Sequence, residues 1–319
     1  MKIVVLDGYA ENPGDLTWEG LEKLGKLVVY DRTEEGKIID RIKNAEIVIV
    51  NKTKISKKVL DKCPVVRYIG VLATGYNNID VEYARKKNII VANVPTYGTF
   101  AVGQFAIALL LEICHRIGHH DKVVHEGKWS KNADWCFWDY PLIELSGKTM
   151  GIIGLGRIGK ITGTIGKALG MKVIAYTPHP QALANKEVEF VEKLDTFFAQ
   201  ADVVVLHCPL LPETQEIINK INIEKMKDGV IIINNSRGGL INEKDLAEAL
   251  KSGKVYAAGL DVVSTEPIRE DNPLLTAPNC IITPHISWAA KASRRRLLDI
   301  AVENVAAFIA GNPINIVNK

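Results

Sequence analysis

Three polar segments each follow a short apolar run that predicts a β-strand, and together they supply an arginine, a glutamate and a histidine. Arg237 lies in INNSRGG, Glu266 in GLDVVSTEP and His285 in ITPHISWAA. The carboxyl ends of the strands of a doubly wound sheet converge on one crevice. We therefore expect these three side chains to lie at the edge of a single site.

These residue types suit hydride transfer to a 2-keto acid. Hydride reaching the carbonyl carbon leaves charge on the oxygen, and a protonated His285 can donate the proton as general acid. Glu266 beside it favours the imidazolium form. The fixed fork of Arg237 can polarise the carbonyl or clamp the substrate carboxylate. Each residue alone is equally compatible with a surface, turn or buried position, so the prediction depends on all three following strands.

A glycine-rich turn predicts a dinucleotide cofactor for that reaction. The segment GIIGLGRIGK contains Gly154, Gly156 and Gly159 between a predicted strand, 149–153, and a predicted helix, 158–169. The first glycine permits the tight bend, the second lets the backbone approach a pyrophosphate, and the third lets the helix pack against the strand. The first turn of the helix then offers N–H groups to the phosphates.

The sequence leaves the choice between NAD and NADP open. An acidic residue about 20 positions after the turn would hold the ribose 2′-hydroxyl of NAD and repel the 2′-phosphate of NADP. Thr177 stands at that place, and no arginine follows nearby to hold a phosphate. His179 is the only candidate cation there.

Apolar strands alternate with helical patterns along the chain, as is typical of parallel α/β sheets. A helix is expected after Thr99, with apolar residues every four positions from Phe105 to Ile117, and another amphipathic helix over 288–310. We predict an α/β fold of two doubly wound, Rossmann-like parallel-sheet domains with a cleft between them. The strands are expected over residues 2–6, 27–30, 46–50, 68–71, 89–91, 149–153, 172–176, 202–206, 230–233, 255–260 and 280–283.

Composition argues against several other classes of protein. The 319 residues are 47% hydrophobic and 24% charged, and the net charge of +3 gives no reason to expect nucleic acid or a membrane as partner. Five cysteines spread singly along the chain favour reduced thiols in a cytoplasmic protein over a disulfide framework. We expect neither a signal peptide nor a transmembrane helix.

In order and spacing, several motifs resemble the D-isomer-specific 2-hydroxyacid dehydrogenases, most closely their glycerate dehydrogenase/hydroxypyruvate reductase branch. The resemblance covers nearly the whole chain. It implies a discontinuous substrate domain, 1–98 plus 289–319, beside a nicotinamide-dinucleotide-binding domain, 99–288. It also implies a homodimer with the helix after Thr99 and the aromatic loop 127–140 at the interface. The motifs are GVLATGYNNID (70–80), NVPTYGTFAVGQFAIALLLE (93–112), FWDYPLIELSGKTMGIIGLGRIGK (137–160), HCPLLPET (207–214), NNSRGG (234–239), GLDVVSTEP (259–267) and PHISWA (284–289).

The resemblance assigns roles to individual residues. Arg237, Glu266 and His285 match the catalytic trio, with His285 as proton donor. Trp288, next to His285, is expected from its position alone to shape the substrate pocket. Leu72, Ala73 and Gly75 match the family's substrate loop, whose backbone N–H groups would hold the substrate carboxylate. Asn51 and Lys52 match a second loop that faces the same cleft. The remaining cofactor contacts match Arg157, Ile158, Cys208, Pro209, Thr214, Ser236 and Asp261.

Several alternatives stay open at this stage. The substrate is expected to be hydroxypyruvate or glyoxylate, but phosphohydroxypyruvate, pyruvate or a branched 2-keto acid would fit the same motifs. A nucleotide-sensing protein without catalysis could use the same fold. No metal site is predicted: the helical i, i+4 spacing of His115 and His119 could bind a metal, but we expect these histidines to lie on a solvated surface. The run 294–296 of three arginines is expected to be a solvated helix face.

Overall fold

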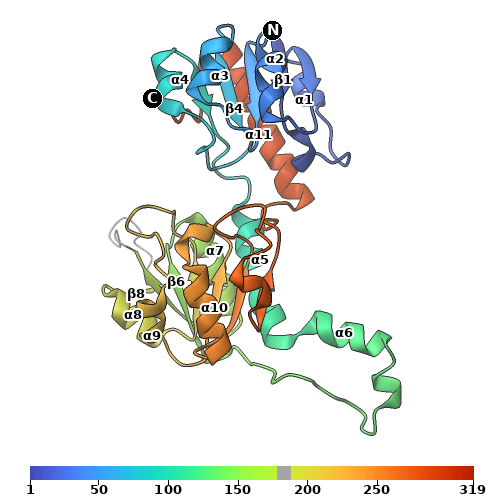
Figure 1. The fold of residues 1–319 in the computed structure, drawn as a ribbon, viewed down its shortest axis with the longest axis vertical. Helices are drawn as coiled ribbons and strands as arrows, with labels where there is room; N and C mark the ends of the chain where they lie inside the picture. Colours follow the sequence, from blue (N-terminus) through green and yellow to red (C-terminus); the bar gives the residue numbers. More distant parts are fainter. Residues whose placement is uncertain (178–187) are drawn as a thin grey trace. The chain divides into compact units, whose positions relative to one another are not determined.

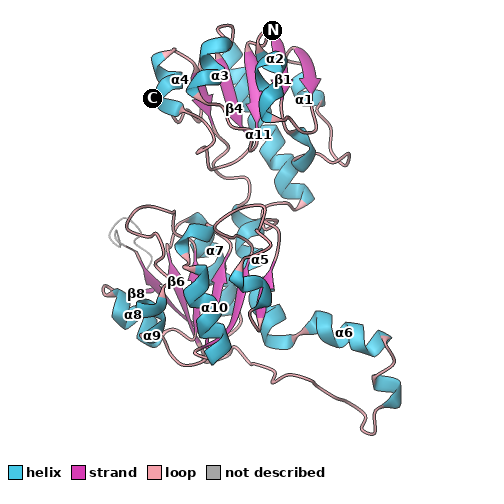
Figure 2. Cartoon of the chain, in the orientation of Figure 1, coloured by secondary structure: helices cyan, strands magenta, loops and turns pink. Residues whose placement is uncertain are grey.

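The computed structural model describes residues 1–177 and 188–319 and divides the chain into two compact units (Figure 1). The first unit comprises Met1–Gly98 and Trp288–Lys319, and the second comprises Thr99–Ser287. Each unit contains one β-sheet with helices around it (Figure 2), and every pair of named neighbouring strands is parallel. The predicted pair of parallel-sheet α/β domains is confirmed.

The sheet of the first unit has the strand order β2-β1-β3-β4-β5 and is buried on both faces. Side chains alternate along a strand, so Ile3 and Val5 enter one apolar cluster and Val4 enters the other. Helix α11, near the C-terminus, covers the face of the sheet to which Ile3 belongs. The elements are β1 (Lys2–Val5), α1 (Glu19–Glu22), β2 (Lys26–Val29), α2 (Ile38–Ile42), β3 (Ile47–Val50), α3 (Lys57–Lys62), β4 (Tyr68–Val71), α4 (Val81–Lys86), β5 (Ile90–Ala92) and α11 (Lys291–Ile309).

The sheet of the second unit has the order β12-β11-β10-β9-β6-β7-β8. Ile152 and Val205 pack on the side covered by α5, whereas Ile153 and Leu206 pack on the side covered by α8 and α10. The elements are α5 (Thr99–His115), α6 (Ile117–His125), β6 (Thr149–Ile153), α7 (Arg157–Ala168), β7 (Lys172–Tyr176), β8 (Glu189–Phe190), α8 (Leu194–Gln200), β9 (Val203–Leu206), α9 (Lys220–Glu224), β10 (Val230–Asn234), α10 (Glu243–Ser252), β11 (Val255–Leu260) and β12 (Cys280–Ile282).

The helix after Thr99 ends earlier than the apolar spacing predicts. Arg116 has a left-handed backbone (φ 50°), and its Nη2 donates to Asn279 Oδ1 at 2.8 Å. The chain turns there by 55° into α6, which Figure 1 shows extending away from the rest of its unit. Ile117 is consequently 61% exposed and does not join the buried face. Over the described residues, no single helix meets the length and apolarity of a membrane span, whereas α5 and α6 taken together as a bent pair do.

Candidate active site

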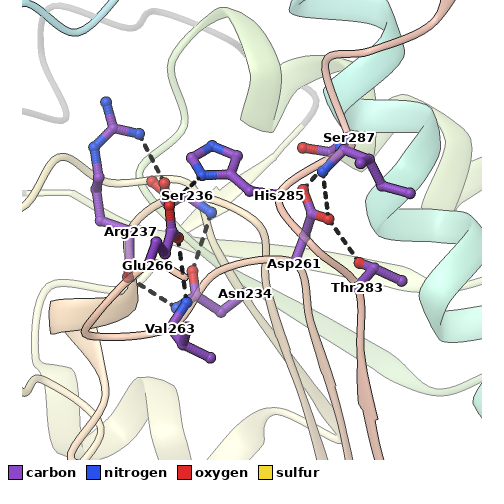
Figure 3. Close-up of polar contacts among 10 residues, drawn as sticks. Asn234, Ser236, Arg237, Asp261, Val263, Glu266, Thr283, His285 and Ser287 are labelled. Atoms are coloured by element: carbon purple, nitrogen blue, oxygen red, sulfur yellow. Dashed lines mark hydrogen bonds and ion pairs between the residues drawn. The ribbon is translucent and has the colours of Figure 1, made fainter. Parts of the chain in front are cut away.

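Arg237 follows β10 on a backbone segment pressed against the loop after β11. A Cβ on Gly238 would lie 1.9 Å from the carbonyl carbon of Val263, so only glycine permits this approach. Asn234 fixes the turn, because its Nδ2 donates to the Arg237 carbonyl at 2.9 Å and its Oδ1 accepts from the Ser236 N–H at 3.1 Å. Figure 3 shows the exposed Arg237 side chain beside a glutamate–histidine pair.

That pair consists of His285, which follows β12, and Glu266, which follows β11. Nδ1 of His285 lies 2.7 Å from Oε2 of Glu266, and the two side chains are 27% and 37% exposed. A carboxylate at Nδ1 orients the ring, which leaves Nε2 as the nitrogen available for proton exchange. The three sequence-predicted catalytic residues therefore come from neighbouring strand ends, in an arrangement suited to general acid catalysis.

Asp261 holds the backbone that carries His285. Its Oδ1 accepts from Thr283 Oγ1 at 2.6 Å and from the Ile286 N–H at 2.8 Å, and its Oδ2 accepts from the Ser287 N–H at 2.8 Å (Figure 3). The Asp261 side chain is completely buried. These bonds brace a backbone in which His285 has a positive φ of 56°, a conformation that is uncommon outside glycine. The structure thus places Asp261 behind the histidine, as a residue that positions it.

The glycine turn has the geometry expected for a pyrophosphate. Gly154 has φ 94°, and a Cβ there would lie 2.6 Å from the Cys208 backbone nitrogen. A Cβ on Gly159 would lie 2.4 Å from the Gly154 carbonyl oxygen, so the helix packs tightly on the turn. A Cβ on Gly156 would meet nothing within 4 Å, and no side chain caps α7 there. Open space in front of an uncapped helix start, next to Arg157 and Ile158, fits an anionic group.

Cys208 and Ser236 line the next two strand ends beside this turn. Ser236 Oγ donates to the Cys208 carbonyl at 2.8 Å, and Thr214 Oγ1 donates to the Pro209 carbonyl at 2.7 Å. These bonds close the loop after β9. Burial raises the pKa of the Cys208 thiol to about 11, so the thiol stays protonated and unreactive at neutral pH.

His207, in the same segment, was not predicted as a site residue. Its Nε2 lies 2.8 Å from Oγ1 of Thr162 in α7, and burial lowers its pKa to about 4. The ring is therefore neutral at pH 7 and links the loop after β9 to α7. The signal in the sequence was a polar residue directly after an apolar strand run.

Thr177 stands at the position expected to influence the choice between NAD and NADP. Thr177 directly follows β7, at the end of the strand beside the glycine turn. The structure therefore puts a hydroxyl, not a carboxylate, at the expected ribose position. His179 lies outside the described residues.

The proposed substrate loop follows β4 in the first unit. Leu72 is buried, and its N–H donates to the Val50 carbonyl at 2.7 Å, so this N–H belongs to the sheet. That bond removes Leu72 from the set of backbone donors that the resemblance implies, and Ala73 and Gly75 remain. The Asn51 side chain is 5% exposed, and its Nδ2 donates to the Leu72 carbonyl at 2.8 Å.

The role expected for Trp288 stays a prediction, whereas the expectation for the arginine run changes in the structure. Trp288 packs in the first unit, edge-to-face against Tyr97 with ring centroids 6.3 Å apart. The expectation that the arginine run is solvated is wrong for Arg294, which is 8% exposed and forms a double hydrogen bond with Asp15 at 2.7 Å. Charge alone did not reveal this inward position on α11.

The histidine pair also lies differently from the spacing argument. His115 ends α5 and His119 lies in α6, so the left-handed Arg116 separates them. His119 Nε2 instead lies 2.8 Å from Asp139 Oδ2. The described residues contain no group of three or more histidine, cysteine, aspartate or glutamate side chains placed to hold a metal ion.

Comparisons with known proteins agree with this geometry. Residues 107–287 match the family model "D-isomer specific 2-hydroxyacid dehydrogenase, NAD binding domain". A hydroxypyruvate reductase from Blautia hydrogenotrophica is 66% identical over 323 aligned positions, with all of both chains covered. A glycerate dehydrogenase from Methylorubrum extorquens is 38% identical over 88% of each chain. Among solved structures, an acyclic imino acid reductase (Bsp5) in complex with NADPH and D-Arg has a TM-score of 0.86 and 28% identity, over 99% of this chain and 100% of that one.

Proposed function

Since the chain belongs to the D-isomer-specific 2-hydroxyacid dehydrogenases, we propose that it reduces hydroxypyruvate to D-glycerate or glyoxylate to glycolate. The observation that carries the chemistry is the 2.7 Å contact between His285 and Glu266 beside Arg237. The names of the Blautia and Methylorubrum relatives favour a small hydroxylated substrate.

In this proposal, the glycine turn would hold a reduced nicotinamide dinucleotide, which would be the source of the hydride for the carbonyl carbon. Nε2–H of His285 donates the proton to the carbonyl oxygen as charge develops there. Glu266 keeps the ring oriented and stabilises the imidazolium before transfer. Arg237 polarises the carbonyl or pairs with the substrate carboxylate through its planar fork. In the reverse reaction His285 takes the same proton back.

We assign the cofactor to the second unit and the substrate carboxylate to the first. The glycine turn, Arg157 and Ile158 would hold the pyrophosphate, and Cys208, Pro209, Thr214 and Ser236 would shape the rest of the cofactor site. Asp261 would support that site from behind, through the backbone of His285. The backbone N–H groups of Ala73 and Gly75 bind the carboxylate, with Lys52 adding positive charge. Trp288 limits the size of the substrate side chain.

We propose that both NADH and NADPH are accepted. Thr177 carries no charge that would repel a 2′-phosphate, and a hydroxyl can still hydrogen-bond to a ribose. The imino acid reductase structure, which contains NADPH, shows that a similar fold accepts the phosphorylated cofactor.

We also propose a cytoplasmic homodimer. The segment that extends away from the second unit, α6 and the loop after it, exposes large apolar side chains: Ile117 at 61%, Trp129 at 52%, Trp135 at 86%, Trp138 at 65% and Leu142 at 54%. Such a set is expensive to leave in water and is typical of a protein interface. The five cysteines are all free thiols, which suits a reducing compartment.

The test is an initial-rate assay that follows loss of the reduced nicotinamide absorbance, with NADH and NADPH separately. The panel contains hydroxypyruvate, glyoxylate, pyruvate, phosphohydroxypyruvate and a branched 2-keto acid. The highest kcat/KM with hydroxypyruvate or glyoxylate supports the proposal. A clear preference for another acid would move the substrate assignment, and cofactor binding without turnover of any acid would favour a nucleotide sensor.

A further inference from the structure

A second carboxyl group, Glu11, is buried in the first unit behind the substrate loop. It is completely inaccessible to solvent, and its Oε1 accepts a short hydrogen bond from Nδ2 of Asn51. The same Asn51 nitrogen donates to the Leu72 carbonyl at 2.8 Å, so its two hydrogens join Glu11 to the start of the loop. Oε2 of Glu11 is buried and makes no hydrogen bond.

The surroundings of Glu11 contain charges of both signs. Asp7 lies near it, with its Oδ1 accepting from the Asn51 N–H at 2.7 Å and its Oδ2 accepting from the Lys52 N–H at 2.6 Å. Arg294 Nη1 donates to the Glu11 carbonyl at 3.0 Å, but the guanidinium is also engaged by the carboxylate of Asp15.

Burial is the largest influence on Glu11, and it raises the pKa of this carboxyl to about 8. The negative charge of Asp7 adds to the increase, while Arg294, the Asn51 hydrogen bond and Lys52 oppose it. At neutral pH the side chain is therefore neutral, which explains how a carboxyl without solvent can stand behind a loop proposed to bind an anion.

We propose that Glu11 is a positioning residue that acts through Asn51 on the Leu72 peptide and so sets the affinity of the loop for the substrate carboxylate. The inference builds on the proposed function, since it concerns the same loop. Glu11 in its neutral form leaves the field at Ala73 and Gly75 favourable to an anion. Ionised Glu11 places a negative charge behind those donors and weakens substrate binding.

The proposal predicts a change in KM more than in kcat. Above about pH 8 the KM of the wild type for hydroxypyruvate should rise roughly tenfold relative to that of E11Q, because glutamine keeps the acceptor and cannot ionise. Their kcat values should follow the same pH dependence, since His285 and Glu266 are unchanged. E11A, which removes one of the two acceptors of the Asn51 amide nitrogen, should raise KM by roughly tenfold at neutral pH as well.

The experiment measures kcat and KM from about pH 6 to about pH 9.5 for the wild type, E11Q, E11A and a control. The control is E19Q, since Glu19 is an exposed carboxylate of the same unit that pairs with Lys23 on the surface. Its KM profile should match that of the wild type. If the KM values of the wild type and E11Q keep a constant ratio from about pH 6 to about pH 9.5, the proposal is overturned.

Two further measurements separate this inference from the proposed function. Calorimetric titration with oxalate in the presence of the oxidised cofactor reports carboxylate binding without turnover. Infrared difference spectra of wild type minus E11Q report the protonated carboxyl directly. If no keto acid is turned over but oxalate affinity falls at alkaline pH in the wild type alone, the function is wrong and the inference stands. Equal oxalate affinities for both proteins, or no protonated carboxyl at pH 7, would reject the inference.

Discussion

Each unit has a carboxyl group in a segment that follows one of its parallel strands, and the two carboxyl groups differ in burial and in partner. In the second unit, Glu266 is 37% exposed and lies against an imidazole. In the first unit, Glu11 is completely buried and accepts a hydrogen bond from a neutral amide. The difference shows how one side-chain type serves two purposes. A partly hydrated carboxylate can stabilise a cation that exchanges protons, while a buried one is held neutral and orders the backbone.

The largest effect should follow loss of the histidine in the exposed pair. His285→Ala should lower kcat by about 10²- to 10⁴-fold, because it removes the proton donor, and should leave cofactor affinity nearly unchanged. Steady-state rates give kcat, and fluorescence titration with NADH gives the cofactor affinity. His115→Ala is the matched control, since this histidine is exposed at the end of α5. Normal turnover by His285→Ala would remove the proton-donor assignment.

The next effect concerns the shape of the cation rather than its charge. Arg237→Lys should reduce kcat/KM roughly a hundredfold, because an ammonium group cannot reproduce the planar fork that faces a carbonyl or carboxylate. The control Arg269→Lys changes an exposed arginine that pairs with Asp271 at 3.0 Å. If Arg237→Lys retains full kcat/KM, charge alone is sufficient at this position.

A smaller effect is expected at the ribose position. Thr177→Asp should shift the ratio of kcat/KM values toward NADH by about tenfold, because a carboxylate repels the 2′-phosphate of NADPH. Thr177→Ser keeps the hydroxyl and should keep the wild-type ratio. Both variants are compared in the same reductase assay, and an unchanged ratio in Thr177→Asp would exclude contact between this residue and the ribose.

The smallest expected effect is the influence of Glu11 on the pH dependence of the free energy of unfolding. Folded chains hold the Glu11 proton up to about pH 8, whereas unfolded chains release it near the ordinary value of 4.5. Stability from this group is therefore fully present below the ordinary value and is lost as pH rises through about 8. The free energy of unfolding of E11Q, measured in urea, should exceed that of the wild type by a margin that widens over this range. A constant margin would mean that Glu11 does not titrate as described.

The comparison also shows what sequence could reveal. Strand ends, the glycine turn and the order of motifs predicted the sheets, because apolar runs and the period of the pattern are local properties. Arg237, Glu266 and His285 could be placed together, since parallel strands end on one edge. Glu11 and Asp261 could not be given their roles, because burial and partners far along the chain decide what each carboxyl does. Arg294 was misjudged for the same reason: its partner Asp15 lies in another segment.

The helix break at Arg116 was missed for a different reason. The apolar spacing continued through Ile117, and nothing in the local sequence marks a left-handed residue there. The Arg116 contact with Asn279 comes from 163 positions further along the chain. Local pattern could therefore predict the helix but not its end.

The most direct test of the central claim is the stereochemistry of the product. Purified protein is given hydroxypyruvate and reduced nicotinamide, and the glycerate formed is resolved by chiral chromatography. The account predicts D-glycerate, which the wild type should form about 10²- to 10⁴-fold faster than His285→Ala. Formation of L-glycerate, or no glycerate at all, would contradict it.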